Sequence, residues 1–300
     1  MEERKLKIDL AEHIPYLRHS LKELKLRRKV YKIFFRGKSF EFDGFRPYSA
    51  EDDVTSIDWK ASIRADKLLE RQYKELEDKK ILFVIDVGEH MIFGSTEKLK
   101  CEYTAEVVLS LAHLILGSND RLGYILFNDS IKYLAIPRRG MRHFYSFASR
   151  LEDPESYGGG SDLKEILEYV ASNFDTSLTA VIIFSDFIKS GREVKKALDL
   201  VSSKFETLAI MIKDPLDKEL PDIPGEYVIE DPESGEQVLV EPRLAKQKYA
   251  RHARIQEEMM KEIFKSSNVD LLPLMTDKPF VADLTEFIKR RIEYRSYPTA

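Results

Sequence analysis

Oxygen-bearing side chains stand at three places that could converge at one edge of a sheet: two of them follow buried strands and one follows a glycine run. Asp86 ends the apolar run 81–85, Ser161 follows a run of three glycines, and Asp186 follows the apolar run 181–184. Carboxylates and hydroxyls are hard oxygen ligands of the kind that Mg²⁺ prefers. We therefore take Asp86, Ser161 and Asp186 as candidate metal ligands, with Mg²⁺ as the ion that suits them. A metal-free cluster held by hydrogen bonds is the favoured interpretation of this degenerate site, and a bound Mg²⁺ or another metal is the alternative.

The elements around these residues decide whether they can meet. Apolar runs without alternation predict strands that are covered on both faces, at 81–87, 122–127, 180–184, 208–212 and 271–275. A further strand at 131–136 is expected to form a hairpin with 122–127 around Asn128-Asp129-Ser130. Helical spacing is found between the strands, at 97–116, 142–151, 162–174, 193–203 and 279–291. Strands that alternate with helices indicate an α/β fold with a doubly wound, mostly parallel six-stranded sheet. The ends of its parallel strands would bring the three candidate ligands to one edge.

The chain is expected to have two parts. Residues 1–78 are predicted to form an N-terminal basic helix at 14–29 and a small β-rich subdomain with strands within 31–48 and 67–76. Residues 79–300 are predicted to form the α/β domain, with an insertion at 213–268 before its last strand. The insertion joins an acidic excursion containing Pro and Gly to a charged amphipathic helix at 243–266. Its length favours a functional appendage over a simple connector.

Composition places the chain in a reducing interior. Cys101 is the only cysteine, so no disulfide can form within the chain. No apolar run reaches the roughly 18 residues of a membrane span, and the first residues lack the apolar segment of a secretory signal. We therefore expect a cytoplasmic protein. Asn and Gln are scarce while charged residues make up 33%, which is typical of heat-adapted proteins.

Two basic segments are candidates for binding partners. Residues 22–38 are rich in Lys and Arg and could contact phosphate groups of a nucleic acid or an anionic lipid surface. A solvated helix face is the other interpretation of that segment. Arg138 and Arg139 form a basic turn after a strand, which could meet an acidic partner or merely close a loop.

The only tryptophan, Trp59, lies in a segment dense in acids and bases. We expect a buried polar network there, in which Asp52 and Asp58 accept hydrogen bonds from Arg46, Lys60 or Arg64. The indole is expected to fill a pocket.

Several motifs together carry a family resemblance. They are Arg46-Pro47-Tyr48, Ile57-Asp58-Trp59-Lys60, Asp120-Arg121-Leu122-Gly123, Gly159-Gly160-Ser161-Asp162-Leu163 and Ser185-Asp186-Phe187. In this order they resemble the family known as domain of unknown function 58, whose members carry a von Willebrand factor A-like domain. The resemblance implies that fold, and a metal-site motif Asp-x-Ser-x-Ser starting at Asp86. Here Gly88 and His90 replace both serines. His90 could instead supply a nitrogen ligand, which suits a softer ion such as Zn²⁺.

The resemblance also bears on function. Family members are often encoded beside MoxR-type AAA+ ATPases and look like adaptors or assembly factors for them. The chain has no phosphate-binding loop with its lysine, no Gly-x-Ser-x-Gly elbow and no His-Glu-x-x-His pair. We therefore expect a non-enzymatic protein-interaction module that docks a MoxR-type ATPase or its client. The alternatives are a metal-dependent hydrolase using Asp86, His90 and Asp186, and electrostatic binding of nucleic acid or anionic lipid through residues 22–38.

Overall fold

A computed structural model describes residues 6–9, 14–15, 17, 40–49, 57–75, 79–230 and 235–293. The chain divides into two compact units, one formed by Arg36–Lys79 and the other by Met1–Phe35 together with Lys80–Ala300. The smaller unit ends within one residue of the predicted boundary at residue 78, but the residues up to Phe35 are assigned to the larger unit and not to the predicted N-terminal part. Leu17 is fully buried in its core, and the amide of Lys7 donates to Glu102 Oε1 at 2.8 Å. Most of the predicted helix 14–29 lies outside the described residues.

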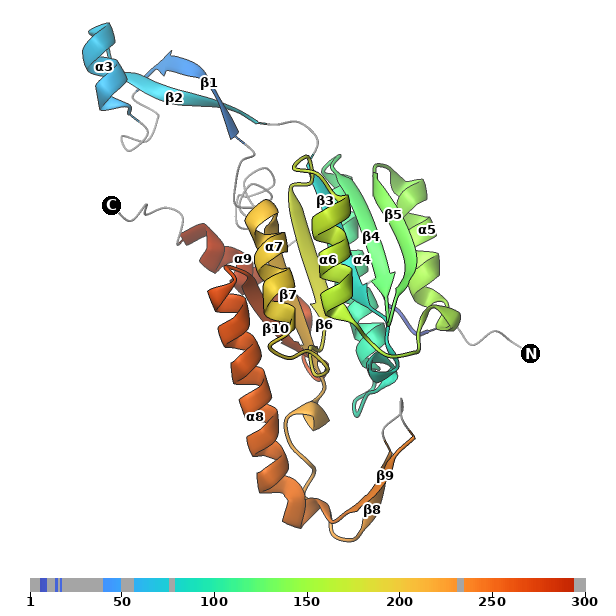
Figure 1. Cartoon of the computed structure of the whole chain (residues 1–300). Coiled ribbons are helices and arrows are strands. Elements are labelled where there is room, and N and C mark those ends of the chain that lie inside the picture. The colour runs from blue at the N-terminus through green and yellow to red at the C-terminus, as the bar shows by residue number, and fades with distance from the viewer. Residues whose placement is uncertain are drawn as a thin grey trace. The chain divides into compact units, whose positions relative to one another are not determined.

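The larger unit is built on a six-stranded sheet in the order β10-β7-β6-β3-β4-β5 (Figure 1). Its strands are β3 (Lys80–Asp86), β4 (Arg121–Phe127), β5 (Ile131–Arg138), β6 (Ala180–Ser185), β7 (Glu206–Lys213) and β10 (Asp270–Met275). All neighbouring pairs are parallel except β4 and β5, which form the expected antiparallel hairpin. The predicted α/β class with a mostly parallel six-stranded sheet is therefore confirmed.

Helices cover both faces of this sheet, as the unbroken apolar strands predict. The helices are α4 (Lys100–Gly117), α5 (Met141–Glu152), α6 (Leu163–Asn173), α7 (Val194–Lys204), α8 (Pro242–Ser266) and α9 (Phe280–Glu293), with short 3-10 turns η2 (Glu89–Ile92), η3 (Pro154–Ser156) and η4 (Pro215–Asp217). Side chains of α4, α5 and α9 share one hydrophobic cluster, and those of α6, α7 and α8 share another. Strand β3 contributes to both, with Phe83 in the first and Val84 in the second. Each such fully buried side chain contributes roughly 1.5–3 kcal/mol, so β3 is firmly fixed.

Strand β3 lies at the point where the order of the sheet reverses. The chain leaves β3 through α4 to β4 on one side, whereas β6 pairs with β3 on the other side. Ligands of open α/β sheets bind at such a point, beyond the carboxyl ends of the strands. We call the edge at which the parallel strands end the carboxyl edge; Asp86 stands there as the last residue of β3.

The insertion extends beyond the carboxyl edge (Figure 1). It contains η4, an antiparallel hairpin of β8 (Tyr227–Glu230) and β9 (Gln237–Val240), and α8, which matches the predicted helix 243–266. We call residues 215–241 the hairpin arm. Within the part of the chain that is described, no helix is both long and apolar enough to cross a membrane.

The smaller unit consists of the antiparallel strands β1 (Phe40–Pro47) and β2 (Leu69–Glu75) and the helix α3 (Trp59–Ala65). The expected pocket for the indole is wrong, because the side chain of Trp59 is 60% exposed. The buried residue of α3 is Ser62, whose hydroxyl donates to Asp58 O at 2.7 Å. Asp58 caps the helix through Ala61 N, and Arg46 pairs with Glu70. Asp52 lies outside the described residues.

Candidate functional site

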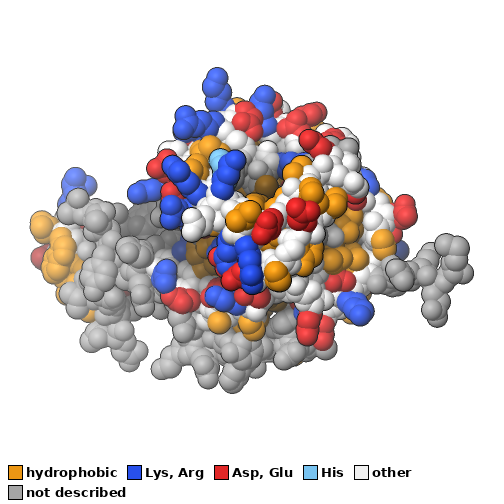
Figure 2. Space-filling view, turned by 90° about the horizontal axis from the view of Figure 1, so that it is seen from below, with side chains coloured by type: hydrophobic (Ala, Val, Ile, Leu, Met, Phe, Trp, Pro, Cys, Tyr) orange, Lys and Arg blue, Asp and Glu red, His pale blue; other side chains and the backbone are white. Residues whose placement is uncertain are grey.

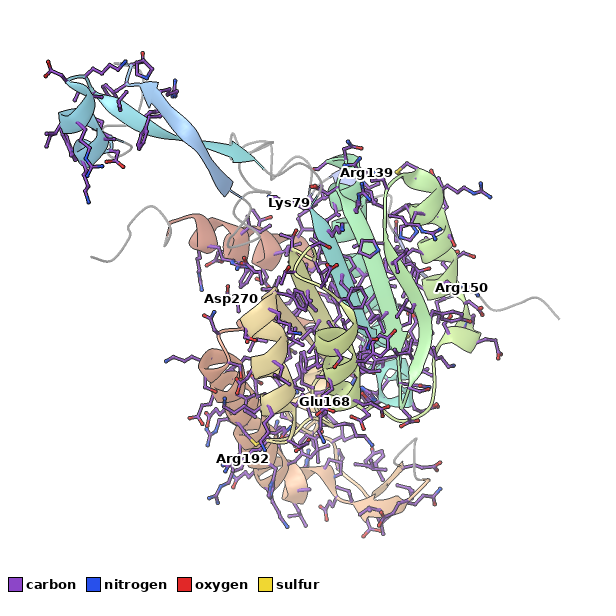
Figure 3. All side chains as sticks on the ribbon, turned by 45° about the horizontal axis from the view of Figure 1, so that its top comes forward. Lys79, Arg139, Arg150, Glu168, Arg192 and Asp270 are labelled. Atoms are coloured by element: carbon purple, nitrogen blue, oxygen red, sulfur yellow. The ribbon has the colours of Figure 1, made fainter. Side chains whose placement is uncertain are left out.

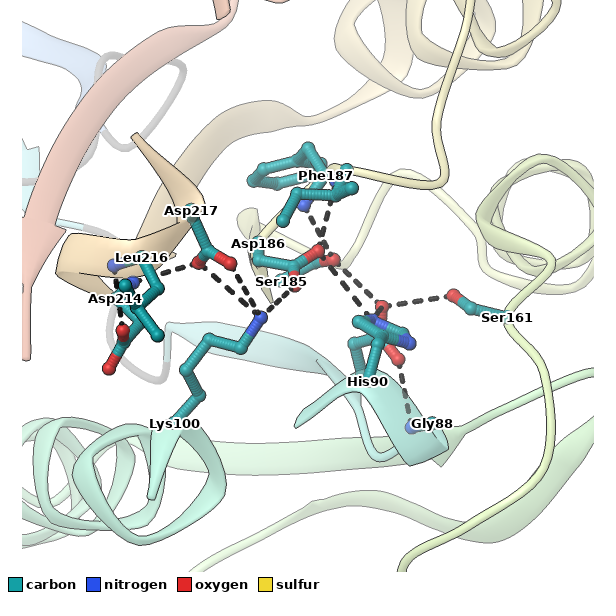
Figure 4. Close-up of polar contacts among 12 residues, drawn as sticks. Gly88, His90, Lys100, Ser161, Ser185, Asp186, Phe187, Asp214, Leu216 and Asp217 are labelled. Carbon is teal, nitrogen blue, oxygen red and sulfur yellow. Dashed lines mark hydrogen bonds and ion pairs between the residues drawn. The ribbon is translucent and has the colours of Figure 1, made fainter. Parts of the chain in front are cut away.

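Asp86 lies at the centre of a buried hydrogen-bond network at the carboxyl edge. Figure 4 shows its partners, which include Gly88, His90 and Ser161. Its Oδ2 accepts from Ser185 Oγ at 2.7 Å and Ser161 Oγ at 2.9 Å, and lies 3.2 Å from His90 Nε2. Its Oδ1 accepts from Gly88 N at 3.0 Å. The structure thus brings Asp86 and Ser161 into direct contact, and both carboxylate oxygens already have partners.

His90 joins Asp86 to Asp186. Its Nε2 lies 3.6 Å from Asp186 Oδ1, while the imidazole Nδ1 is buried and has no hydrogen-bond partner. Burial alone would lower the pKa of His90, but the hydrogen bond and charge of Asp86 and the charge of Asp186 raise it above its ordinary value. A raised pKa favours the imidazolium, which adds positive charge between the two carboxylates.

Gly88 shows why the first serine of the family motif is missing. A Cβ at this position would lie 2.6 Å from the carbonyl oxygen of Gly160 and 2.7 Å from Cε1 of His90. The backbone of Gly88 is extended and open to other residues (φ −61°, ψ 164°), so the constraint is space. The imidazole therefore occupies volume that a side chain at position 88 would need.

Lys100 is the residue that sequence analysis missed. It is the first residue of α4, yet its side chain is only 2% exposed. Its Nζ lies 2.5 Å from Asp186 Oδ2 and 3.4 Å from Asp217 Oδ2 (Figure 4). Burial alone would lower the pKa of Lys100, but the two carboxylates raise it. In turn, burial would raise the pKa of Asp186, while Lys100 and His90 hold it below its ordinary value.

Two aspartates after β7 attach the beginning of the hairpin arm to this site. Asp217 in η4 meets Lys100, and burial raises its pKa. Asp214 Oδ2 accepts from Ser95 N at 2.8 Å and from Thr276 Oγ1 at 3.1 Å. The site therefore fixes the first turn of the insertion against the sheet.

The side chains present do not fit a divalent cation. The ammonium of Lys100 occupies the position facing Asp186 and Asp217, and His90 stands between Asp86 and Asp186. A second buried lysine, Lys213, adds positive charge close to Asp186 and Asp217. Among the described residues, no group of three or more His, Cys, Asp or Glu side chains has the geometry of a metal site.

Arg138 and Arg139 lie at the other edge of the sheet. Arg138, the last residue of β5, pairs with Leu122 near the start of β4, whereas Asp86 pairs with Phe127 at the end of β4. Figure 3 shows Arg139 at the opposite end of the sheet from Arg192, which follows β6. Both arginines are exposed, but they do not join the cluster around Asp86.

The hairpin arm carries the other feature of this edge. Its strands expose apolar side chains, and Val228 and Leu239 are 61% and 62% exposed. Figure 2 views the molecule from this end and shows apolar side chains interspersed with charged ones. Exposed apolar patches of this kind commonly mark interaction sites.

Solved structures to which the chain is similar include two from Bacteroides. One is described as an aerotolerance-related membrane protein of Bacteroides fragilis; it is 15% identical, with a TM-score of 0.48, over 72% of this chain and 99% of that chain. The values for the conserved hypothetical protein BatB of Bacteroides thetaiotaomicron are the same. A von Willebrand factor type A protein from Catenulispora acidiphila is 9% identical, with a TM-score of 0.37, over 74% of this chain and 43% of that chain.

Curated relatives are found in mycobacteria. Uncharacterized proteins of Mycobacterium bovis and Mycobacterium tuberculosis are each 27% identical over 250 residues, covering 82% of this chain and 78% of theirs. Residues 44–259 match the family described as protein of unknown function DUF58. That range includes most of the six-stranded sheet, which agrees with the von Willebrand factor A-like fold expected of the family. The chain belongs to the DUF58 family.

Proposed function

We propose that this protein is a non-enzymatic protein-interaction module that docks its partner on the hairpin arm. The observation that carries the proposal is the exposure of apolar side chains on both faces of the β8–β9 hairpin. Val228 pairs with Leu239 across the strands, and Ile229 pairs with Val238. Because successive residues of a strand point to opposite faces, these two pairs lie on opposite sides, and all four side chains are exposed.

A hairpin that exposes apolar side chains on both faces is expected to have little stability of its own. An isolated two-stranded hairpin is at best marginally stable in water, and packing its apolar face against another surface adds the missing stability. Contacts of Asp214 and Asp217 hold the base of the arm at the carboxyl edge, and Figure 1 shows the hairpin beyond the end of the sheet. A partner that covers one or both faces would remove this apolar surface from water.

Charge defines the partner's complementary surface. Every charged side chain from Glu219 to Glu241 is acidic. Of these, Glu226, Glu230 and Glu236 are exposed on or beside the hairpin strands. The partner surface should therefore combine apolar side chains with Lys or Arg, because complementary charge gives specificity and faster association.

A MoxR-type AAA+ ATPase is the partner we propose, on the strength of the family resemblance, with the cytoplasm as the place of action. Arg138 and Arg139 lie at the other edge and are not part of the proposed surface. The hydrolase alternative is weaker, because Lys100 and His90 already neutralise the carboxylates that its metal would need. The segment proposed for nucleic acid or lipid binding, residues 22–38, lies outside the described residues.

The test is a binding assay with the purified ATPase encoded nearest to this protein. We expect the two proteins to co-elute in gel filtration and the rate of ATP turnover to change. Val228→Ser/Leu239→Ser should abolish both effects. Leu200→Ser is the matched control, because Leu200 is also an exposed apolar residue (51%) but lies on α7.

Independent elution and unchanged ATP turnover of the native pair would contradict the choice of partner. Equal loss of binding in Leu200→Ser and in the hairpin variant would contradict the choice of surface.

A further inference from the structure

Positive groups of the chain itself meet the carboxylates at the carboxyl edge. Lys100 Nζ contacts Asp186 and Asp217, and His90 Nε2 contacts Asp86 and lies near Asp186. We propose that the ammonium of Lys100 takes the place of a divalent cation, so that this edge is an internal ionic lock and binds no metal. The inference concerns the site alone and holds whichever partner docks on the hairpin arm.

Lys100 Nζ lies between two carboxylates in a buried site, not in a surface ion pair. The side chain enters from the first turn of α4, where it is buried against the ring of Phe93, whose centroid lies 5.6 Å from Nζ. Its ammonium then meets carboxylates from two other elements, the end of β6 and η4. An ammonium is a compact point charge with three donors, so it can bridge two carboxylates as a cation would.

The local sequence around Asp86 has the matching change. A metal-ligating hydroxyl at position 88 has no room, because its Cβ would lie 2.6 Å from the Gly160 carbonyl. Asp86 Oδ2 is shared by two serine hydroxyls and His90, which leaves it poorly placed for a further ligand bond. Gly88, His90 and Lys100 therefore form one consistent arrangement in which protein donors supply the contacts that a metal would otherwise make.

The lock has a mechanical consequence. Asp217 belongs to η4, so its contact with Lys100 connects the base of the hairpin arm to α4 and β6. Asp214 adds hydrogen bonds from Ser95 and Thr276. An ionic lock of this kind fixes the arm at all metal concentrations, whereas a metal-bridged one would depend on the supply of the ion.

The first test uses the native full-length protein. Calorimetric titration with Mn²⁺ or Mg²⁺ to millimolar concentration is expected to give no heat of binding, and the thermal midpoint should be the same in EDTA and in excess Mg²⁺. Binding of one Mn²⁺ per chain that is lost in Asp86→Ala would overturn the proposal.

The second test removes the ammonium. Lys100→Met keeps most of the apolar stem but leaves Asp186 and Asp217 without their cation. We expect its thermal midpoint to be lower in EDTA and to rise by about 5–10 °C at a hundredfold excess of free Mg²⁺ or Mn²⁺ over its dissociation constant. Lys98→Met is the matched control. Lys98 lies two residues before Lys100, is partly exposed and pairs with Glu106. Its midpoint should not respond to metal.

If the Lys100→Met protein folds but its thermal midpoint does not change with either ion, the proposal that Lys100 replaces a cation is contradicted. If that variant does not fold in either condition, the native titration decides, since metal binding by the native protein rules the lock out and its absence supports it.

Discussion

Two neighbouring regions at the carboxyl edge differ in which side chains they bury. Around Asp86 and Lys100, charged groups are buried and each meets a partner within the chain. On the β8–β9 hairpin, apolar side chains are exposed, and Val228 pairs with Leu239 and Ile229 with Val238 across the strands. The cluster around Asp86 carries the residues of a binding motif, but its polar groups are already paired within the chain. The hairpin carries no recognisable motif, but its apolar side chains are exposed to a partner.

This contrast locates stability and binding in different places. Changes among the buried charges should destabilise the fold, because a buried charge that loses its partner is costly. Changes on the hairpin should leave the fold intact, because substitutions of exposed residues away from special features have small effects. The predictions below test that separation, from the largest expected loss of stability to the smallest.

The largest effect is expected at Lys100. Lys100→Met leaves Asp186 and Asp217 buried without a cation, so the free energy of unfolding should fall by about 3–5 kcal/mol. Adding Asp186→Asn to this variant removes one of the uncompensated charges, so the double variant should be more stable than the sum of the single losses predicts. Urea denaturation of the two single variants and the double variant measures these free energies. Additive losses would mean that Lys100 and Asp186 do not form a buried pair.

Gly88 should come next. Gly88→Ala places a Cβ against the Gly160 carbonyl and the His90 ring, so we expect a loss of about 1–3 kcal/mol. Adding His90→Ala should restore only part of it, because the carbonyl contact remains. Gly117→Ala is the control. Gly117 is the last residue of α4, and a Cβ added there would meet no atom within 4 Å. That substitution should be neutral or slightly stabilising, and an equal loss at both glycines would contradict the role of space at Gly88.

A pH dependence is expected from Asp214. Burial alone would raise its pKa, but hydrogen bonds from Ser95, Leu216 and Thr276 lower it below the ordinary value. A carboxylate with a lowered folded-state pKa contributes stability above the unfolded pKa of about 3.9, and that contribution is lost as the pH falls further. Asp214→Asn should therefore lower stability at neutral pH and flatten its fall below pH ~4. Parallel curves for the native protein and the variant would remove Asp214 as a cause.

The smallest effect on stability is expected on the hairpin. Val228→Ser/Leu239→Ser should change the free energy of unfolding by no more than about 0.5 kcal/mol per substitution, although it should abolish partner binding. Leu200→Ser on α7 should match it in stability and keep binding. A large loss of stability in the hairpin variant would mean that these side chains pack within the fold after all.

The fold was largely predictable because its signals are local. Unbroken apolar runs such as 81–85 specify strands buried on both faces, and their alternation with helical periodicity specifies a doubly wound sheet. Asp86 and Asp186 were found because strand ends converge at one edge, and Ser161 was found because it follows the glycine run 158–160 before a predicted helix. The hairpin arm was recognised as an insertion, but its strands are short and were not predicted. The exposure of Trp59 was missed because the pattern around it shows no periodicity.

Lys100 could not be assigned its role for a different reason. Its partners Asp186 and Asp217 are 86 and 117 residues away in the chain, and a lysine in the first turn of a helix is ordinarily solvated. One signal was available: most side chains of α4 are apolar or small on every side, so a charged residue at its start would be buried and in need of a partner. Gly88 and His90 were recognised as departures, but their mutual contact required coordinates.

The contrast between the two regions can be tested in a single binding experiment. The equilibrium affinity of the nucleotide-free MoxR-type ATPase for this protein would be measured in EDTA and in millimolar Mg²⁺, with the native chain and with Val228→Ser/Leu239→Ser. We predict equal affinity in both buffers for the native chain and no binding by the hairpin variant in either. Affinity that disappears in EDTA and survives the hairpin substitutions would place docking at a metal-dependent site and contradict this account.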